Sequence, residues 1–329
     1  MDKHIYKPEL LAPAGSPETL RAAVQAGADA VYLGAARFSA RANAKNFHGD
    51  ALADAITYAR QHGVAVHLAV NTLMTDRELD EAIQLVANCH QLGVAAFIVQ
   101  DLGLGARIRE TFPQAVLHAS TQMTAKTLAD VQALGRLGYK RVVMARELSA
   151  AQLRDIAAGT DVELEVFVHG ALCSSESGQC LMSAFIGGAA GGRSANRGAC
   201  AQPCRLPYTA GSAKLAKSSF SPSKRNHPSA APLLSLKDLC LIDHVGALAQ
   251  MGIASLKIEG RMKGVDYVRT VVGAYRKVLD GGVLSAKERE RLFAVFNRGG
   301  YTAGYFDGQT AGMYMDALSN PYKKGKSNP

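Results

Sequence analysis

Several common signatures are missing from this sequence, and each absence excludes a class of protein. No apolar run approaches the ~20 residues of a membrane span, and Met1 to Lys7 lacks the apolar core of a signal peptide. The 329 residues are 48% hydrophobic, which is neither a disordered nor a fibrous composition. We therefore expect a cytoplasmic protein without a membrane span, in which the six cysteines are free thiols or metal ligands rather than disulfides.

Acidic residues are absent from one long segment, between Glu176 and Asp238. The same segment contains eight basic residues, which are Arg193, Arg197, Arg205, Lys214, Lys217, Lys224, Arg225 and Lys237. It accounts for +8 of the formal net charge of +9. Because lysine and arginine neutralise phosphates, the segment indicates a surface for a polyanion such as RNA.

Several nucleotide, metal and hydrolase motifs are also missing. The turn after the first apolar run, residues 12–16, lacks the G-x-G-x-x-G dinucleotide fingerprint. C-x2-C pairs are absent, which argues against a zinc ribbon. Neither H-E-x-x-H nor G-x-S-x-G occurs, so zinc-protease and serine-hydrolase signatures are absent. A thiolate–imidazolium pair of Cys173 with His169 or His118 stays open, although a lone nucleophile would not need three further thiols nearby.

Short β-branched or aliphatic runs alternate with helical patterns along the chain. Nine runs are candidate strands, over residues 9–12, 30–34, 64–70, 95–99, 115–118, 141–144, 163–168, 233–236 and 255–258. Ser16 before Pro17 predicts one helix start, Thr75 with Glu78 predicts another, and an amphipathic helix is expected over 265–279. Strands that are apolar along most of their length favour an α/β fold with a parallel TIM-like (β/α) barrel, complete or distorted. A doubly wound sheet is the alternative.

The barrel is predicted over residues 1–285, with a Cys-rich insertion over 165–205 at the C-terminal end of a strand. A stretch without periodicity over 209–232 predicts a mobile loop, and 286–329 is predicted as a C-terminal extension. In such barrels, chemistry gathers at the C-terminal ends of the strands. Polar residues occur at several of these ends, among them His118, Arg146, His169, Lys257 and Arg261. Each one alone fits a helix cap or a solvated loop residue, but together they predict one polar mouth.

Four cysteines lie in the Cys-rich insertion, and a fifth follows the predicted mobile loop. Their spacing is Cys173-x6-Cys180-x19-Cys200-x3-Cys204-x35-Cys240. Thiolates bind zinc or iron–sulfur clusters, and five cysteines offer four ligands and a spare. The spacing alone does not choose between zinc and iron. Cys89, in a helical pattern, is expected to be a small buried side chain.

Seven stretches of this sequence resemble the U32 family, historically called collagenase-like peptidases. They are residues 9–16, 28–34, 165–173, 177–183, 193–205, 234–240 and 257–261. The resemblance implies a (β/α) barrel-like fold and likeness to oxygen-independent hydroxylases of an rRNA cytidine, a tRNA wobble uridine or the ubiquinone ring. It also implies a [4Fe-4S] cluster and prephenate as the hydroxyl source. By the same resemblance, the preferred ligands are Cys173, Cys180, Cys200 and Cys240, with Cys204 as the alternative.

The predicted function is therefore the oxygen-independent hydroxylation of a base of rRNA or tRNA. RNA is the preferred substrate because the acid-free segment suits a phosphate backbone. A U32 peptidase and a ubiquinone-ring hydroxylase subunit are the alternatives, and a non-catalytic RNA-binding protein would have no cluster. The expected partners are RNA, an electron donor and a second U32 subunit.

Two sets of site residues follow from this prediction. His118, His169 and Glu165 are the predicted catalytic residues, because imidazole and carboxyl groups carry protons near neutral pH when their environment tunes them. The carboxylates of prephenate need charge-assisted partners, and those predicted to bind them are Arg146, Arg193, Arg197, Lys257 and Arg261.

Overall fold

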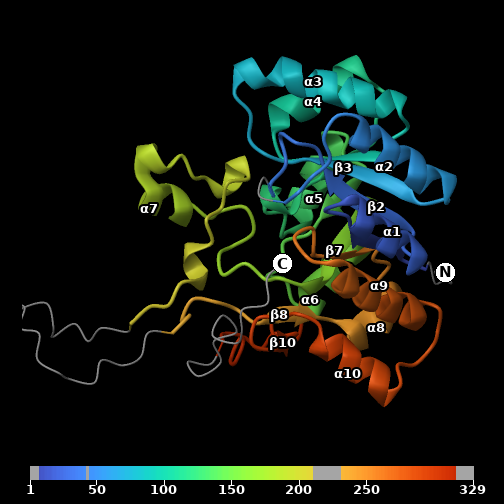
Figure 1. Ribbon diagram of the computed structural model, residues 1–329, viewed down its shortest axis with the longest axis vertical. Helices are drawn as coiled ribbons and strands as arrows, with labels where there is room; N and C mark the ends of the chain where they lie inside the picture. Colours follow the sequence, from blue (N-terminus) through green and yellow to red (C-terminus); the bar gives the residue numbers. More distant parts are fainter. Residues whose placement is uncertain (1–6, 42–43, 210–230, 316–329) are drawn as a thin grey trace, which may run out of the picture.

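The computed structural model describes residues 7–41, 44–209 and 231–315, and within them eight parallel strands close into a barrel (Figure 1). Each strand pairs with the next from β1 to β7, and β9 pairs with both β7 and β1. The ring consists of β1 (Glu9–Pro13), β2 (Ala30–Gly34), β3 (Ala65–Val70), β4 (Ala96–Val99), β5 (Leu117–Ala119), β6 (Arg141–Val143), β7 (Glu163–Gly170) and β9 (Ser255–Ile258). The prediction of a closed parallel barrel is confirmed.

Helices surround the ring and cover its outer face, where the main apolar core lies (Figure 1). They are α1 (Pro17–Gln25), α2 (Asp50–Gln61), α3 (Asp76–Gln91), α4 (Leu102–Thr111), α5 (Leu128–Arg136), α6 (Ala150–Ala158), α8 (Val245–Gln250) and α9 (Val265–Leu279). Because side chains alternate along a strand, every second one points into the barrel instead. Leu11, Ala30, Tyr32 and Ile98 form a small apolar cluster separate from the outer core.

The start signals of α1 and α3 act as the sequence predicts. The Ser16 side chain accepts a hydrogen bond from the backbone N–H of Thr19, with Pro17 as the first residue of α1. At α3, the Glu78 carboxylate accepts from the backbone N–H of Thr75 at 2.9 Å. Gly27, which follows α1, has a φ of 89°, the left-handed conformation that closes a helix. Cys89 lies buried in α3, as expected.

The predicted strand over 233–236 is wrong. Leu233 and Leu234 lie exposed in a turn, and the strand, β8 (Asp238–Cys240), begins later. β8 lies outside the ring and runs antiparallel to β7, with His169 opposite Cys240. A short leucine-rich run does not by itself distinguish a strand from a turn, and here Pro232 precedes the run.

The predicted C-terminal extension contributes two elements to the described structure. Helix α10 (Ala286–Ala294) contacts α9, and strand β10 (Tyr301–Thr302) pairs in parallel with β8. The central part of the predicted mobile loop, residues 210–230, lies outside the described residues. None of the helices in the described ranges has the length and apolar character needed to cross a membrane.

The Cys-rich segment, defined here as residues 171–208, leaves the C-terminal end of β7 and extends beside the barrel mouth (Figure 1). It contains α7 (Met182–Gly191) and two single-turn 3-10 helices, Ala195–Arg197 and Pro203–Arg205. A backbone hydrogen bond of 3.0 Å from Leu73 to Asn196 ties the segment to the loop after β3. The segment therefore forms a cover over the mouth rather than a part of the barrel wall.

Candidate metal centre and anion site

A cavity of about 570 Å³ lies between the C-terminal mouth of the barrel and the Cys-rich segment. Its floor is formed by inward-pointing strand residues, including Tyr32, Ile98, Phe167 and Lys257. This volume lies in the range of ~300–1,000 Å³ that is usual for small-molecule sites. Active sites of parallel barrels lie at the C-terminal ends of the strands, and the cavity lies at that end.

Four half-buried thiols line this cavity: Cys173, Cys180, Cys200 and Cys204. Burial raises the pKa of the Cys180 thiol, and the neighbouring sulfurs of Cys173, Cys200 and Cys204 raise it further. Sulfur ligands of this kind are stabilised by hydrogen-bond donors around them. The Cys200 sulfur accepts such bonds from the backbone N–H of Gln202 at 3.4 Å and from the Ser183 hydroxyl at 3.8 Å.

The chemistry of the donor set fits a soft-metal group. Four thiolates are the complete ligand set of either a tetrahedral zinc ion or a [4Fe-4S] cluster, and the cavity supplies four thiols. The residues present therefore fit both groups.

Cys240, one of the four preferred ligands, does not line the cavity. It lies in β8 beside α9, with its sulfur 4.0 Å from the Tyr275 hydroxyl. Burial raises the pKa of the Cys240 thiol. Cys240 pairs with His169 of β7, and both side chains face the Tyr275 hydroxyl rather than the cavity. The structure therefore gathers Cys173, Cys180 and Cys200 with the alternative ligand, Cys204.

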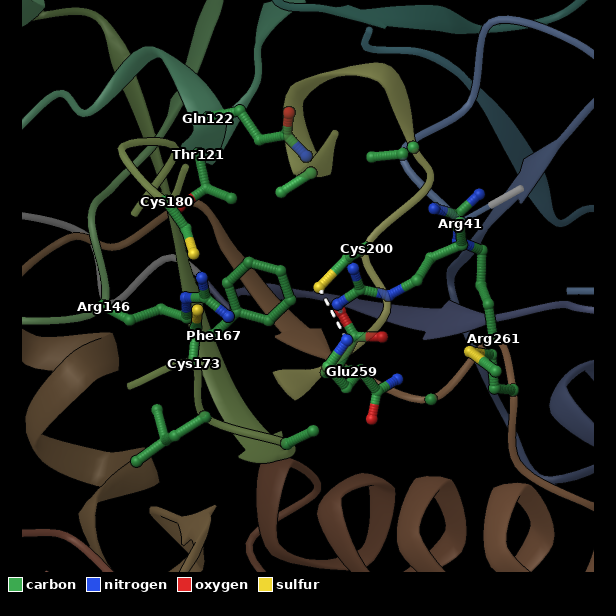
Figure 2. A pocket seen from close by; sticks show the side chains of 18 of the residues that line it. Arg41, Thr121, Gln122, Arg146, Phe167, Cys173, Cys180, Cys200, Glu259 and Arg261 are labelled. Atoms are coloured by element: carbon green, nitrogen blue, oxygen red, sulfur yellow. Dashed lines mark hydrogen bonds and ion pairs between the residues drawn. The ribbon is translucent and has the colours of Figure 1, made fainter. Parts of the chain in front are cut away.

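Positively charged side chains share the cavity with the thiols. Arg41, Arg146, Arg261 and Lys263 all line it, and Figure 2 shows Arg146 beside Cys173 and Cys180. The Arg146 Nε donates to the Ser177 hydroxyl at 3.3 Å, and no carboxylate of the described residues pairs with this guanidinium. Arg261 donates from Nη1 to the Ser39 hydroxyl at 2.6 Å, while its buried Nε has no protein acceptor among the described residues.

Two acids, Glu176 and Glu259, line the cavity, and the buried one, Glu259, partly balances this charge. Burial disfavours its ionisation, but the charges of Arg41 and Arg261 outweigh burial and hold the pKa of Glu259 below its usual value. Its carboxylate lies 3.6 Å from the Arg41 guanidinium. Burial lowers the pKa of Lys263 to about 8, close to neutral pH. A cavity lined by five arginines, two lysines and two carboxylates is suited to an anionic ligand.

Two of the predicted anion-binding arginines lie outside the cavity. Arg197 donates from both terminal nitrogens to Glu78 at 2.7 Å, and it also donates to the Leu73 carbonyl. The hydrogen bonds from Arg197 lower the pKa of Glu78 to about 2. Arg197 therefore fastens the Cys-rich segment to the start of α3. Arg193 is exposed after α7. Arg146, Lys257 and Arg261 do line the cavity.

Below the cavity, a column of paired polar residues fills the barrel. We call Glu9, His67, His118, Arg141, Glu163, Glu165 and Lys257 the interior column. Glu165 is 0% exposed and accepts from Lys257 at 2.7 Å and from Arg141 at 3.4 Å. Arg141 also donates to Glu9 at 2.6 Å and to Glu163 at 2.8 Å.

Two predicted catalytic residues, Glu165 and His118, belong to this column and do not line the cavity. His67, His118 and Glu165 have ligand atoms within 4.8 Å of one another. However, Lys257 and Arg141 already pair with the Glu165 carboxylate and would repel a metal cation. Burial lowers the pKa of His67 to about 3 and that of His118 well below its usual value, so both rings are neutral.

His169, the third predicted catalytic residue, points away from the cavity. The register of β7 against β9 shifts between Phe167 and His169, which marks a bulge. A one-residue irregularity turns the following side chain to the other face of the sheet. Phe167 therefore faces the cavity, whereas His169 packs among Tyr267, Tyr275 and Tyr301. Burial lowers its pKa to about 3.

Several charged cavity residues were missed by the sequence reasoning, among them Arg41 and Lys263. Arg41 lies in the loop after β2, where the sequence offers no motif of known chemistry. Lys263 follows the Lys257–Arg261 stretch by two residues, and its nearness to that stretch was the available signal. Its ammonium group lies 3.7 Å from the ring centre of Phe296, which also lines the cavity.

The fold and the cavity define a (β/α) barrel protein with a candidate soft-metal centre and anion site at its C-terminal mouth. The chain belongs to peptidase family U32, whose family model matches residues 15–316. The resemblance seen in the sequence is thus confirmed.

Named relatives include proteins of RNA modification and a protease. The chain is 36% identical to the 23S rRNA 5-hydroxycytidine C2501 synthase of Escherichia coli K12, over 98% of this chain and 45% of that protein. It is 38% identical to tRNA hydroxylation protein P1 of Bacillus subtilis 168, over 83% of this chain and 63% of that protein. It is also 33% identical to a collagenase of Porphyromonas gingivalis, over 93% of this chain and 75% of that protein. The chain thus spans about half to two-thirds of the first two relatives.

A solved structure of a U32 peptidase, Mk0906, matches 49% of this chain and 69% of its own, with 16% identity and a TM-score of 0.43.

Proposed function

We propose that this protein hydroxylates a base of rRNA or tRNA without molecular oxygen. It would use a [4Fe-4S] cluster at the cavity and prephenate as the hydroxyl source. The observation that carries the proposal is the convergence of four thiols and five arginines in one cavity at the barrel mouth. The names of the rRNA and tRNA relatives support the substrate class.

Cys173, Cys180, Cys200 and Cys204 would hold the cluster. With all four thiolates bound, such a cluster would supply an electron, and with only three bound its open iron would supply a Lewis acid. The Gln202 backbone N–H and the Ser183 hydroxyl donate hydrogen bonds to the Cys200 sulfur and so hold it in position. The Cys-rich segment covers the site.

Arginines on two sides of the cavity are suited to the two carboxylates of prephenate. Figure 2 shows Arg146 on one side of Phe167 and Arg261, with Arg41, on the other. A planar guanidinium binds a carboxylate through two parallel hydrogen bonds, and Arg146 has no competing acid among the described residues. Lys263, with a pKa of about 8, is the cavity group best suited to give or take a proton near neutral pH.

An RNA base would enter the same cavity from the open side. Enzymes that modify a base bring it out of the stack into a pocket lined by aromatic and polar groups. Phe167 and Tyr32 supply the aromatic lining, while Thr121 and Gln122 supply hydrogen-bonding groups. The proposals of an electron donor and of a second U32 subunit rest on the family resemblance alone.

A cysteine-peptidase mechanism has less support from the geometry. It needs a histidine within hydrogen-bond reach of the nucleophilic thiol. Cys173 lines the cavity, but none of the histidines in the described ranges does. His118 lies in the interior column, and His169 is packed among tyrosines behind β7.

Mass spectrometry of rRNA and tRNA nucleosides from cells with and without the gene tests the proposed function. Deletion should remove one hydroxylated nucleoside, and a plasmid copy of the wild type should restore it. A Cys180→Ser copy should not restore it, whereas a Cys89→Ser copy should, because Cys89 is buried in α3 away from the cavity. An unchanged nucleoside profile in the deletion strain would contradict the proposal.

A further inference from the structure

An exposed apolar strip runs outward from the cavity along α7. Met182 lines the cavity, and Phe185 and Ile186 follow at the i+3 and i+4 positions, on the same face of the helix. Phe185 is 81% exposed and Ile186 is 66% exposed. Phenylalanine is costly to leave in water, and an exposed apolar patch of this kind next to a cavity marks an interaction surface.

A face of α7 next to the strip is anchored to the candidate metal centre. Ser183 is buried, and its hydroxyl donates to the Cys200 sulfur at 3.8 Å and accepts from the Ala201 backbone N–H at 3.1 Å. The strip is therefore presented by a helix whose position is tied to one of the cluster thiols.

One cation lies beside α7, in a segment of the chain without acidic residues. No acidic residue occurs between Glu176 and Asp238. Arg193 is exposed, and its side-chain stem lies beside α7, since a Cβ on Gly187 would be 3.8 Å from the Arg193 Cβ. Aromatic rings that stack on bases, combined with nearby cations that bind the backbone, are the two parts of a single-stranded nucleic-acid site. If a second copy of the chain docked on the strip through the same face, two positively charged segments would face and repel each other. RNA is therefore the better occupant.

We propose that α7 is a docking arm for single-stranded RNA. Phe185 stacks on an unpaired base, Arg193 neutralises a neighbouring phosphate, and the strip leads the strand toward Met182 at the cavity. The inference rests on the proposed function, because it assumes that RNA is the substrate, and it specifies where the strand outside the cavity lies.

The test is fluorescence anisotropy of a short, labelled single-stranded RNA with purified full-length protein. Phe185→Ala should weaken binding about tenfold, and Phe185→Tyr should restore it, because stacking is sequence-tolerant and needs only an aromatic face. Arg193→Gln should lower the slope of log affinity against log salt concentration by about 0.7. The matched controls, Phe293→Ala on α10 and Arg154→Gln on α6, should bind as the wild type does.

Three results would overturn the inference. If Phe185→Ala binds RNA like the wild type while the wild type binds in a salt-dependent way, the docking arm is wrong and the proposed function stands. If Phe185→Ala instead converts a dimer into a monomer in sedimentation and leaves RNA affinity unchanged, the strip is a self-association surface. If the wild type does not bind RNA, both proposals fail. Unchanged circular dichroism and iron content in each variant show that the fold is intact.

Discussion

The interior column and the cavity above it lie in one barrel, yet they use charge in opposite ways. In the column, each carboxylate faces a cation: Glu165 pairs with Lys257 and Arg141, and Arg141 also pairs with Glu9. In the cavity, Arg146 faces solvent space without an acid partner among the described residues. Paired buried charge secures one folded arrangement, whereas unpaired charge around a cavity is available to a ligand. Lys257 belongs to both regions, because it lines the cavity floor while its ammonium group is held by Glu165.

The largest expected effect comes from replacing a thiol of the cavity. Cys180→Ser should remove most of the bound iron while the barrel remains folded, because Cys180 lies in the cover and not in the wall. Iron and sulfide analysis after anaerobic purification, with circular dichroism as the folding check, measures this. Cys240→Ala is the matched control and should retain wild-type iron content. Iron loss in Cys240→Ala, with full iron in Cys204→Ala, would show that the cavity set is wrong.

The next largest effect should come from the column. Glu165→Gln leaves the Lys257 and Arg141 charges buried with one partner fewer, and breaking a buried pair in this way costs about 3–5 kcal/mol of unfolding free energy. Denaturant unfolding measures the change. Glu290→Gln, an exposed change on α10, should alter stability by less than about 0.5 kcal/mol. A Glu165→Gln protein as stable as the control would mean that the column does not secure the barrel.

Removing a cavity cation should affect binding rather than folding. Arg146→Gln should weaken prephenate binding about 10- to 100-fold, because a charge-assisted bond contributes about 1.5–3 kcal/mol. Titration calorimetry with prephenate measures the affinity, and unfolding in denaturant should be unchanged. The exposed Arg154→Gln serves as the charge-matched control. Equal affinity in both variants would remove Arg146 from the anion site.

The smallest effect concerns pH. Burial lowers the pKa of His67 and His169 to about 3, against about 6.5 in an unfolded chain. Between these values the unfolded state binds more protons than the folded state. The contribution of these histidines to the free energy of unfolding is therefore fully present above about pH 6.5 and falls as the pH drops toward 3. Each histidine contributes up to about 1.4 kcal/mol per pH unit. Between pH 7 and pH 5, the free energy of unfolding of His169→Phe should therefore fall by about 2 kcal/mol less than that of the wild type. Denaturant unfolding at the two pH values measures the difference. Equal losses would show that His169 is not a buried neutral ring.

Much of the barrel could be predicted from the sequence because its signals are local. The apolar runs, the Ser16 and Thr75 caps and the glycine after α1 each act within a few residues. Cys173, Cys180, Cys200 and Cys204 could be expected to meet because they share one excursion from β7.

The misplaced site residues depend on long-range pairing instead. His169 is turned outward by a bulge against β9, and Cys240 lies on a strand that pairs antiparallel outside the ring. Neither feature has a local pattern in the sequence. Arg41 reaches the cavity only because the ring brings the loop after β2 near Glu259.

The most direct test of the central claim is Mössbauer spectroscopy of the protein after anaerobic reconstitution with labelled iron and sulfide. We expect about four iron atoms per chain with the signal of a [4Fe-4S] cluster, and loss of that signal when Cys173, Cys180, Cys200 and Cys204 are replaced by serine together. Stoichiometric zinc in place of iron, or an iron signal that persists in the four-serine variant, would contradict the account.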